Sequence, residues 1–151
     1  MTNNILDKIV KQKLLKLNKL KKTINTDLLN QNINKEKYFL NFKKKIQDNI
    51  SNNKISIIAE IKKASPSAGV IIENYKPVDL AEKYYENNVT CLSVLTEEDF
   101  FQGSLIHMHK IKQKINLPVL CKDFFIDPFQ VLLAKSYGAD AILIILAAVS
   151  D

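Results

Sequence analysis

The order of hydrophobic and polar residues separates a helical N-terminal segment from an alternating remainder. Over residues 5–28, isoleucine, leucine and valine recur three and four positions apart with lysines between them, which predicts one long amphipathic helix. A shorter helix is predicted over residues 35–48. Its apolar side is marked by Tyr38, Phe39, Phe42 and Ile46. Ser51-Asn52-Asn53 then predicts the turn that closes the segment.

From residue 55 onward, short apolar runs alternate with helical patterns. The runs predict four strands buried on both faces, at residues 55–60, 90–95, 118–122 and 141–146. Helices are predicted between them at residues 77–86, 104–114 and 127–137. Their ends carry typical signals: Pro77 in a first turn, Ser104 and Asp127 as N-caps, Pro128 after the cap, and Gly138 at the last end. Such alternation predicts parallel strands joined by right-handed crossovers.

Two architectures share this order of elements, the doubly wound sheet and the eight-stranded barrel. No Gly-x-Gly-x-x-Gly sequence follows the first predicted strand, and no Walker motif is present. Polar residues instead collect where three strands end: Glu60 and Lys62, Thr96-Glu97-Glu98, and Lys122-Asp123. Functional groups at several strand ends favour the barrel, whose active sites lie at that face.

The predicted fold is therefore an α/β protein of the TIM (β/α)8 barrel family, with about four βα units. Residues 1–50 form an N-terminal helical extension and residues 51–151 the first half of the barrel. Four strands would leave two open edges, and such edges pair with other chains. We expect a fragment, a truncated product or one part of a split chain, with self-association or a complementing C-terminal half as its partner.

Composition narrows the class of protein. With 46% hydrophobic and 25% charged residues, the chain has the balance of a soluble globular protein. The longest apolar stretch, residues 141–149, is too short to span a bilayer. The N-terminal residues alternate leucine and lysine without a compact apolar region, so we do not expect them to act as a secretory signal. Cys91 and Cys121 lack metal-ligand spacing. We expect buried thiols, a cytoplasmic location and no membrane partner.

The positive charge is concentrated at the N-terminus. Twelve lysines accompany four acids in residues 1–50, whereas ten lysines accompany twelve acids in residues 51–151. The chain has no arginine, the residue that bidentate recognition of phosphates and guanines favours. The lysine excess is interpreted as a solvated helix face, and nucleic acid is not expected as a partner.

The candidate chemistry begins with a carboxylate and an ammonium on one strand. Residues two apart on a strand share a face, so Glu60 and Lys62 project together from the end of the first strand. Taken alone, such a pair is more often a solvated rim or a structural ion pair than a catalytic one. The acids at residues 97–99 suggest a cation site, but contiguous acids on a loop are more often solvated.

Three motifs, in order, resemble the indole-3-glycerol phosphate synthase family. They are IAEIKKASPS at residues 58–67, LSVLTEEDFFQGS at 92–104 and LPVLCKDF at 117–124. The sequence ILDKIV at residues 5–10 also resembles the opening of bacterial members. The resemblance implies a TIM barrel with a helical extension over its active-site face. It also implies a phosphorylated, anionic small-molecule substrate and no metal or organic cofactor.

The resemblance implies a role for each matching residue. Lys122 matches the general acid that protonates the substrate carbonyl, and Lys62 matches the lysine that holds the substrate carboxylate. Glu60 matches the carboxylate that keeps both lysines in place. Three further residues match groups that contact the substrate: Ser65 in a loop, and Phe101 and Phe124 against the anthranilate ring. Without the motifs, both phenylalanines would be taken for core residues.

Other hypotheses remain open at this point. The family's general base, two further polar residues and much of its phosphate site belong to the second half of the barrel, so the chain is expected to be inactive alone. The alternative is a non-catalytic half-barrel that serves in binding or assembly. Another phosphate-binding barrel of the same pathway, such as phosphoribosylanthranilate isomerase, is disfavoured by Glu60-x-Lys62 followed by Ser-Pro-Ser.

Overall fold

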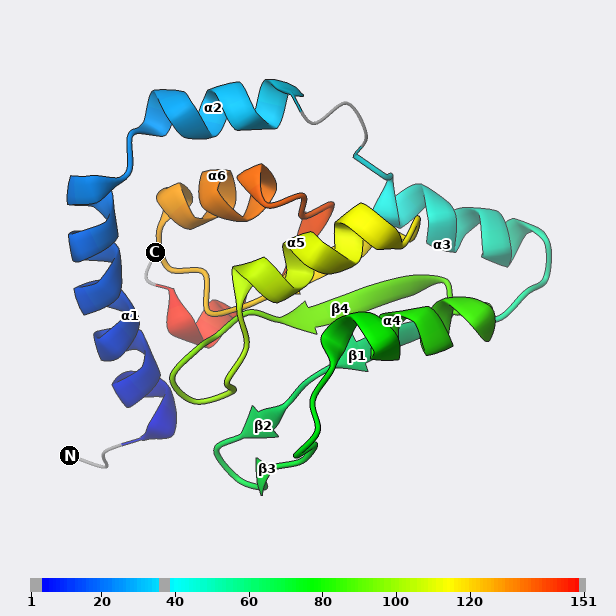
Figure 1. The fold of residues 1–151 in the computed structure, drawn as a ribbon, viewed down its shortest axis with the longest axis horizontal. Coiled ribbons are helices and arrows are strands. Elements are labelled where there is room, and N and C mark those ends of the chain that lie inside the picture. The colour runs from blue at the N-terminus through cyan, green and yellow to red at the C-terminus, as the bar shows by residue number, and fades with distance from the viewer. Residues whose placement is uncertain (1–3, 36–38, 150–151) are drawn as a thin grey trace.

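A computed structural model describes residues 4–35 and 39–149. Three helices come first, α1 (Ile5–Thr23), α2 (Thr26–Lys35) and α3 (Phe42–Ser51). Strands and helices then alternate, as Figure 1 shows, in this order: β1 (Ile58–Ile61), β2 (Ala64–Ser65), β3 (Gly69–Val70), α4 (Pro77–Glu86), β4 (Cys91–Leu95), α5 (Leu105–Lys114), β5 (Val119–Lys122), α6 (Pro128–Ser136), β6 (Ala141–Ile142) and a 3-10 turn, η1 (Leu146–Ala148).

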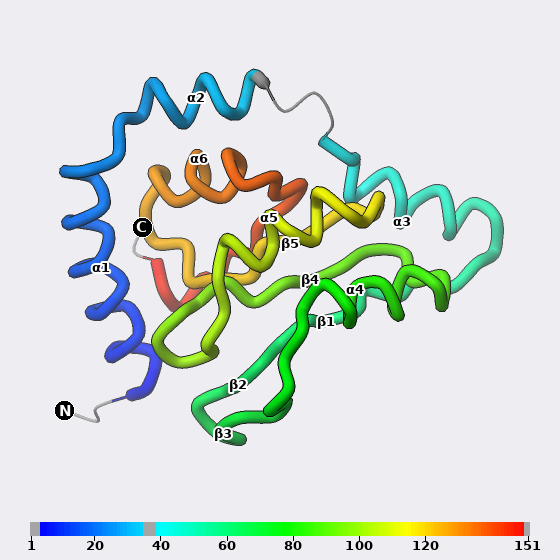
Figure 2. The backbone as a smooth tube through the Cα atoms, in the orientation of Figure 1, coloured from blue at the N-terminus to red at the C-terminus, as the bar shows by residue number. Residues whose placement is uncertain are grey.

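The prediction of one helix over residues 5–28 is wrong, because the chain turns sharply between α1 and α2 (Figure 2). Ile24 is extended, with φ −99° and ψ 122°. The Asn25 side chain accepts a hydrogen bond of 2.8 Å from the Asp27 backbone N–H and so begins a new helix. Helix α2 then packs against α6.

The second predicted helix begins later than expected, at Phe42 rather than at residue 35. Asn41 is its N-cap, and its side chain accepts a 2.9 Å hydrogen bond from the Lys44 backbone N–H. Leu40 is held outside the helix because its N–H donates to the Asp140 carboxylate at 2.7 Å. Tyr38, which was placed on this helix, lies outside the described residues. The turn begins at Asn52 rather than at the predicted Ser51, because Ser51 is still helical.

The four main strands form a parallel sheet in the order β1-β4-β5-β6. Strands β4 and β5 fall within one residue of their predicted bounds, whereas β6 spans only two residues and Leu146 lies in η1. Helices α4, α5 and α6 pack against the face that carries Ile61, Val94 and Cys121. This is the predicted parallel α/β arrangement, in the order of the first four strands of a (β/α)8 barrel, with α4, α5 and α6 between them.

Burial on both faces holds only for β4, whose five residues are all buried. Ile55, Ile57 and Ile58 were expected in a buried strand but are 86%, 53% and 48% exposed. The reason is that Ile55 and Ile57 precede β1, while Ile58 lies on an edge strand, since β1 pairs with β4 alone among the described residues. A β2–β3 hairpin follows β1 where only a loop was predicted. Cys91 and Cys121 are free and buried, as predicted.

The helices α4, α5 and α6 agree with their sequence signals. Ser104 and Asp127 are the N-caps of α5 and α6, and Asp127 forms a complete capping box with Gln130. Gly138, just past α6, has φ +91°, a conformation that favours glycine. No helix in the described ranges is long and apolar enough to cross a membrane.

Candidate active site

The centre of the candidate site is one carboxylate held between two ammonium groups. Glu60 and Lys62 lie at the end of β1, and Lys122 is the last residue of β5. Glu60 Oε1 accepts a hydrogen bond of 2.6 Å from Lys62 Nζ, and its Oε2 accepts one from Lys122 Nζ. Each of the three side chains is about one-third exposed, at 30%, 32% and 36%, so the cluster is open to a ligand.

The register of the sheet explains why these groups meet. Glu60 is aligned with Ser93 on β4, and Lys122 is aligned with Leu95. Alternation along each strand then directs Glu60, Lys62 and Lys122 to the face opposite the helices, while Ile61 and Cys121 face the helical layer. The long Lys122 side chain reaches across β4 to Glu60. The three charges therefore converge because of the strand pairing and the alternation of side chains along each strand.

The two lysines hold Glu60 in its charged form. Partial burial alone would raise the pKa of Glu60, but the hydrogen bonds and positive charges of Lys122 and Lys62 outweigh it and lower the pKa. Glu60 thus remains an anion at neutral pH and fixes the direction of both ammonium groups.

This shift predicts acid sensitivity. Because the folded pKa of Glu60 lies below its usual 4.5, the unfolded chain takes up the proton first, and the stabilisation is lost as the pH falls through the folded value. We expect the free energy of unfolding in urea to fall between about pH 6 and about pH 3, and Glu60→Gln to flatten part of that fall. Asp127, whose pKa is lowered by Lys21 and the Phe129 N–H, accounts for a further part, which Asp127→Asn should remove. An unchanged slope in Glu60→Gln would contradict the charge pairing.

Two aromatic rings lie at the same end of the sheet. Phe101 and Phe124 follow β4 and β5, and their ring centroids are 6.1 Å apart with the planes tilted by 41°. The Ala64 N–H, at the start of the hairpin, donates to the Phe101 carbonyl at 3.3 Å. The loops after β1, β4 and β5 therefore meet here. Ser65 is also in the hairpin, but its hydroxyl interacts with Ser67 and the Ala68 N–H rather than with the charged cluster.

Of the acids at residues 97–99, Glu98 and Asp99 are exposed, as expected, whereas Glu97 is buried. Glu97 is 1% exposed, and its carboxylate accepts backbone hydrogen bonds from Asp99, Phe100 and Phe101 at 3.3, 2.7 and 3.2 Å. Glu98 and Asp99 instead pair with Lys16 on α1 at 3.1 and 2.7 Å. Each acid therefore already has a protein partner, and Glu97 shapes the loop that carries Phe101.

Gly103 allows this loop to return to the sheet. A Cβ atom at this position would lie 2.3 Å from the Leu95 carbonyl oxygen and 2.9 Å from that of Glu97. Since both contacts are with backbone, neither can move cheaply. We expect Gly103→Ala to lower the free energy of unfolding by about 1–3 kcal/mol, measured by urea denaturation. Gly69→Ala is the control. Its Cβ would meet nothing within 4 Å, but φ is +66°, so this variant introduces backbone strain without a clash. Equal losses of unfolding free energy in the two variants would argue against the clash at residue 103.

Sequence reasoning missed one charged group beside the site. Lys13 was assigned to a solvated helix face, yet its side chain is 10% exposed and pairs with Asp123 at 2.7 Å and Glu97 at 3.6 Å. The available signal was its position, because Ile9, Lys13 and Leu17 are four residues apart and form the buried stripe of α1. A lysine in an apolar stripe predicts a buried anionic partner.

Comparison with known proteins agrees with these features. A sequence model described as "Indole-3-glycerol phosphate synthase" matches residues 6–151. The chain belongs to the indole-3-glycerol phosphate synthase family. Members of this family are TIM-barrel carboxy-lyases of tryptophan biosynthesis.

Curated relatives with the same description span a range of bacteria. The chain is 41% identical over 148 residues to the protein of Microcystis aeruginosa, covering 98% of this chain and 49% of that protein. It is 53% identical over 97 residues to the protein of Trichodesmium erythraeum, covering 64% and 33%. For Bordetella pertussis the identity is 49% over 106 residues, covering 70% and 40%. The chain thus spans at most about half the length of these relatives.

Proposed function

We propose that this chain provides the half of an indole-3-glycerol phosphate synthase active site that contains the general acid. The reaction is the ring closure of 1-(2-carboxyphenylamino)-1-deoxyribulose 5-phosphate, with loss of CO₂ and water, to indole-3-glycerol phosphate. The observation that carries the proposal is the Glu60 carboxylate between Lys62 and Lys122, at the strand ends that also bear Phe101 and Phe124. The proposed substrate has matching groups: a carboxylate for an ammonium, an aromatic ring for the phenyl rings and a carbonyl for a proton donor.

The geometry supports a distinct task for each residue. Lys122 donates a proton to the substrate carbonyl oxygen as the aromatic carbon that bears the carboxylate attacks the carbonyl carbon. Lys62 binds that carboxylate, which leaves as CO₂ when the ring regains its aromaticity. The new hydroxyl then takes up a second proton and departs as water, while the adjacent CH₂ carbon gives up a proton to the family's general base in the second half of the barrel. Glu60 orients both lysines. Phe101 and Phe124 pack on the aromatic ring and keep water from the carboxylate, which favours its loss, and Ser65 contacts the substrate from the hairpin.

We also propose that residues 1–151 do not turn over substrate by themselves, since the family's general base and much of its phosphate site belong to the second half of the barrel. The test is a chimera that joins this chain to the second half of the Microcystis aeruginosa relative. We expect no turnover from the chain alone and measurable turnover from the chimera. A folded chimera without activity would contradict the proposed function, and turnover by the chain alone at the rate of the complete relative would contradict its dependence on a second half.

The partner proposed for this chain is a complementing half-barrel. Among the described residues, β1 pairs only with β4 and β6 only with β5. Large apolar side chains are exposed beside both edges: Ile57 and Ile58 near β1, Ile144 and Leu146 after β6. The alternative, a non-catalytic assembly module, uses the same edges. Size-exclusion chromatography tests both, because a stable monomer of the isolated chain would count against pairing through these edges.

Three further expectations stay predictions: the division at residue 50 into an extension and a half-barrel, a cytoplasmic location, and the absence of nucleic-acid binding. The lysines of α1 bear on the last, since Lys13, Lys16 and Lys21 are paired with acids of the barrel half. Binding to duplex DNA that falls steeply with salt would contradict it.

A further inference from the structure

Lys13 lies at a buried junction between α1 and two loops of the candidate site. Its ammonium contacts Asp123, in the loop after β5, and Glu97, in the loop after β4, and these carboxylates are only 13% and 2% exposed. Two carboxylates so close together with little water repel each other unless a cation lies between them. Lys13 is the cation that lies between them.

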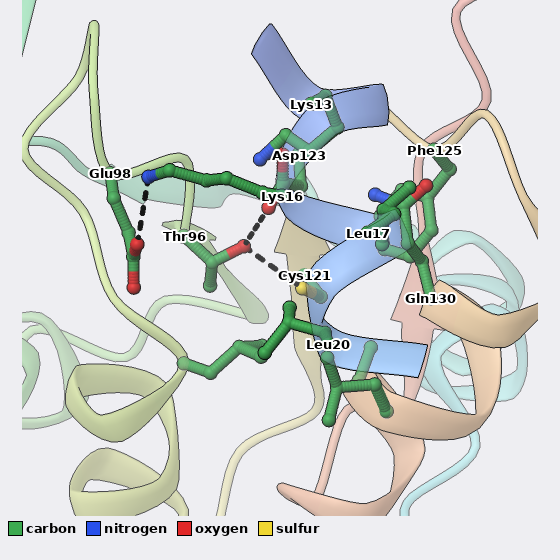
Figure 3. A pocket seen from close by; sticks show the side chains of 13 residues that line it. Lys13, Lys16, Leu17, Leu20, Thr96, Glu98, Cys121, Asp123, Phe125 and Gln130 are labelled. Carbon is green, nitrogen blue, oxygen red and sulfur yellow. Dashed lines mark hydrogen bonds and ion pairs between the residues drawn. The ribbon is translucent and has the colours of Figure 1, made fainter. Parts of the chain in front are cut away.

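Asp123 transmits this contact to the loop after β5. Its carboxylate accepts a 2.7 Å hydrogen bond from the Phe124 N–H and a 3.1 Å hydrogen bond from the Thr96 hydroxyl, the latter drawn in Figure 3. The Thr96 N–H in turn donates to the Lys122 carbonyl at 3.0 Å. The backbone that directly follows Lys122 is therefore tied to the anion that Lys13 neutralises.

Glu97 transmits the same contact to the loop after β4. Its carboxylate accepts hydrogen bonds from three successive backbone N–H groups, including that of Phe101. One ammonium thus fixes the relative position of two loops whose phenyl rings meet 6.1 Å apart. All of these contacts lie beyond the ends of β4 and β5, at the end of the sheet that presents Lys122.

We propose that Lys13 is a positioning residue of the site. Through Asp123 and Glu97 it sets the placement of Lys122, Phe124 and Phe101, so that α1 holds the loops of the site in place without touching the substrate. This assignment rests on the proposed function for its catalytic consequence, but the holding of the loops is a property of the chain alone.

Lys16 provides a matched control on the same helix. It lies one turn beyond Lys13 and also pairs with acids of the loop after β4, Glu98 and Asp99, at 3.1 and 2.7 Å. However, its side chain is 34% exposed, and neither carboxylate accepts a backbone N–H of Phe101 or Phe124. Lys16 can therefore hold α1 to the barrel without setting the loops.

The first test is amide hydrogen exchange of the 151-residue chain. We expect the N–H groups of Phe101 and Phe124 to exchange about tenfold faster or more in Lys13→Met, with the amides of β4 unchanged. Lys16→Met should leave both loops as in the wild type. Glu97→Gln keeps Lys13 and Asp123 and should speed up exchange at the Phe101 N–H but not at the Phe124 N–H. This variant tests the linkage between the loops even if Lys13→Met does not fold. Wild-type exchange in both loops of Lys13→Met, or equal loosening of both loops by Glu97→Gln, would overturn the proposal.

The second test measures turnover in the chimera. Lys13→Met should lower kcat by about tenfold or more, Lys13→Arg should stay within about threefold of wild type, and Lys16→Met should be unchanged. An unaltered kcat in Lys13→Met would overturn the positioning role. A wild-type chimera that lacks turnover would refute the proposed function instead, and the exchange measurement would still decide on Lys13.

Discussion

Replacing Lys122 with methionine is expected to lower the kcat of the chimera by about 10²–10⁴-fold, the usual contribution of a positioned proton donor. Methionine keeps most of the side-chain volume but has no proton to give. Glu60 retains Lys62 as a partner at 2.6 Å, so the fold and the carboxylate site should survive. Steady-state kinetics with the anthranilate-derived ribulotide measures the effect, and circular dichroism checks the fold.

Lys114→Met is the control for this variant. Lys114 lies at the end of α5 and pairs with Glu82 at 2.5 Å, with its side chain 57% exposed. Its loss removes one lysine and one surface ion pair without touching the site, so kcat should not change. A Lys122→Met chimera with more than about a tenth of the wild-type kcat would assign proton donation to another group.

Asp140→Ala is expected to cause the largest loss of stability, about 3–5 kcal/mol, the typical result of removing one partner from a buried ion pair. The Asp140 side chain is fully buried and pairs with Lys112 at 2.6 Å. It also accepts the backbone N–H groups of Val119 at 2.8 Å and Leu40 at 2.7 Å. The variant leaves a largely buried ammonium and two N–H groups without this acceptor. It also releases the segment that leads into α3.

Urea denaturation of the 151-residue chain measures this loss. Asp48→Ala is the matched control, because Asp48 pairs with Lys44 at 3.1 Å within α3 and is 54% exposed. An exposed pair four residues apart on a helix contributes about 0.3–0.5 kcal/mol. Similar losses in the two variants would show that the Asp140 contacts contribute little to stability in solution.

The correct sequence predictions rest on local signals. The cap residues Ser104 and Asp127 and the helix-ending Gly138 determine α5 and α6 because each acts on its own neighbours in the chain. The order of apolar runs determines the parallel βα arrangement. The incorrect predictions concern the bounds of the N-terminal helices, the β2–β3 hairpin and the burial of apolar residues. The isoleucines at residues 55, 57 and 58 are as apolar as the leucines and valine of β4, but Ile55 and Ile57 precede β1 and Ile58 lies on an edge strand.

The sequence by itself determined which residues carry the candidate chemistry, because the strand-end motifs and the alternation of side chains are local properties. Only the tertiary structure decided how distant charges combine. Lys122 meets Glu60 across an intervening strand, and Lys13 leaves its expected solvated face to neutralise Asp123 and Glu97. Such pairings depend on which elements pack together, and an ammonium looks the same in the sequence whether it faces water or a buried carboxylate.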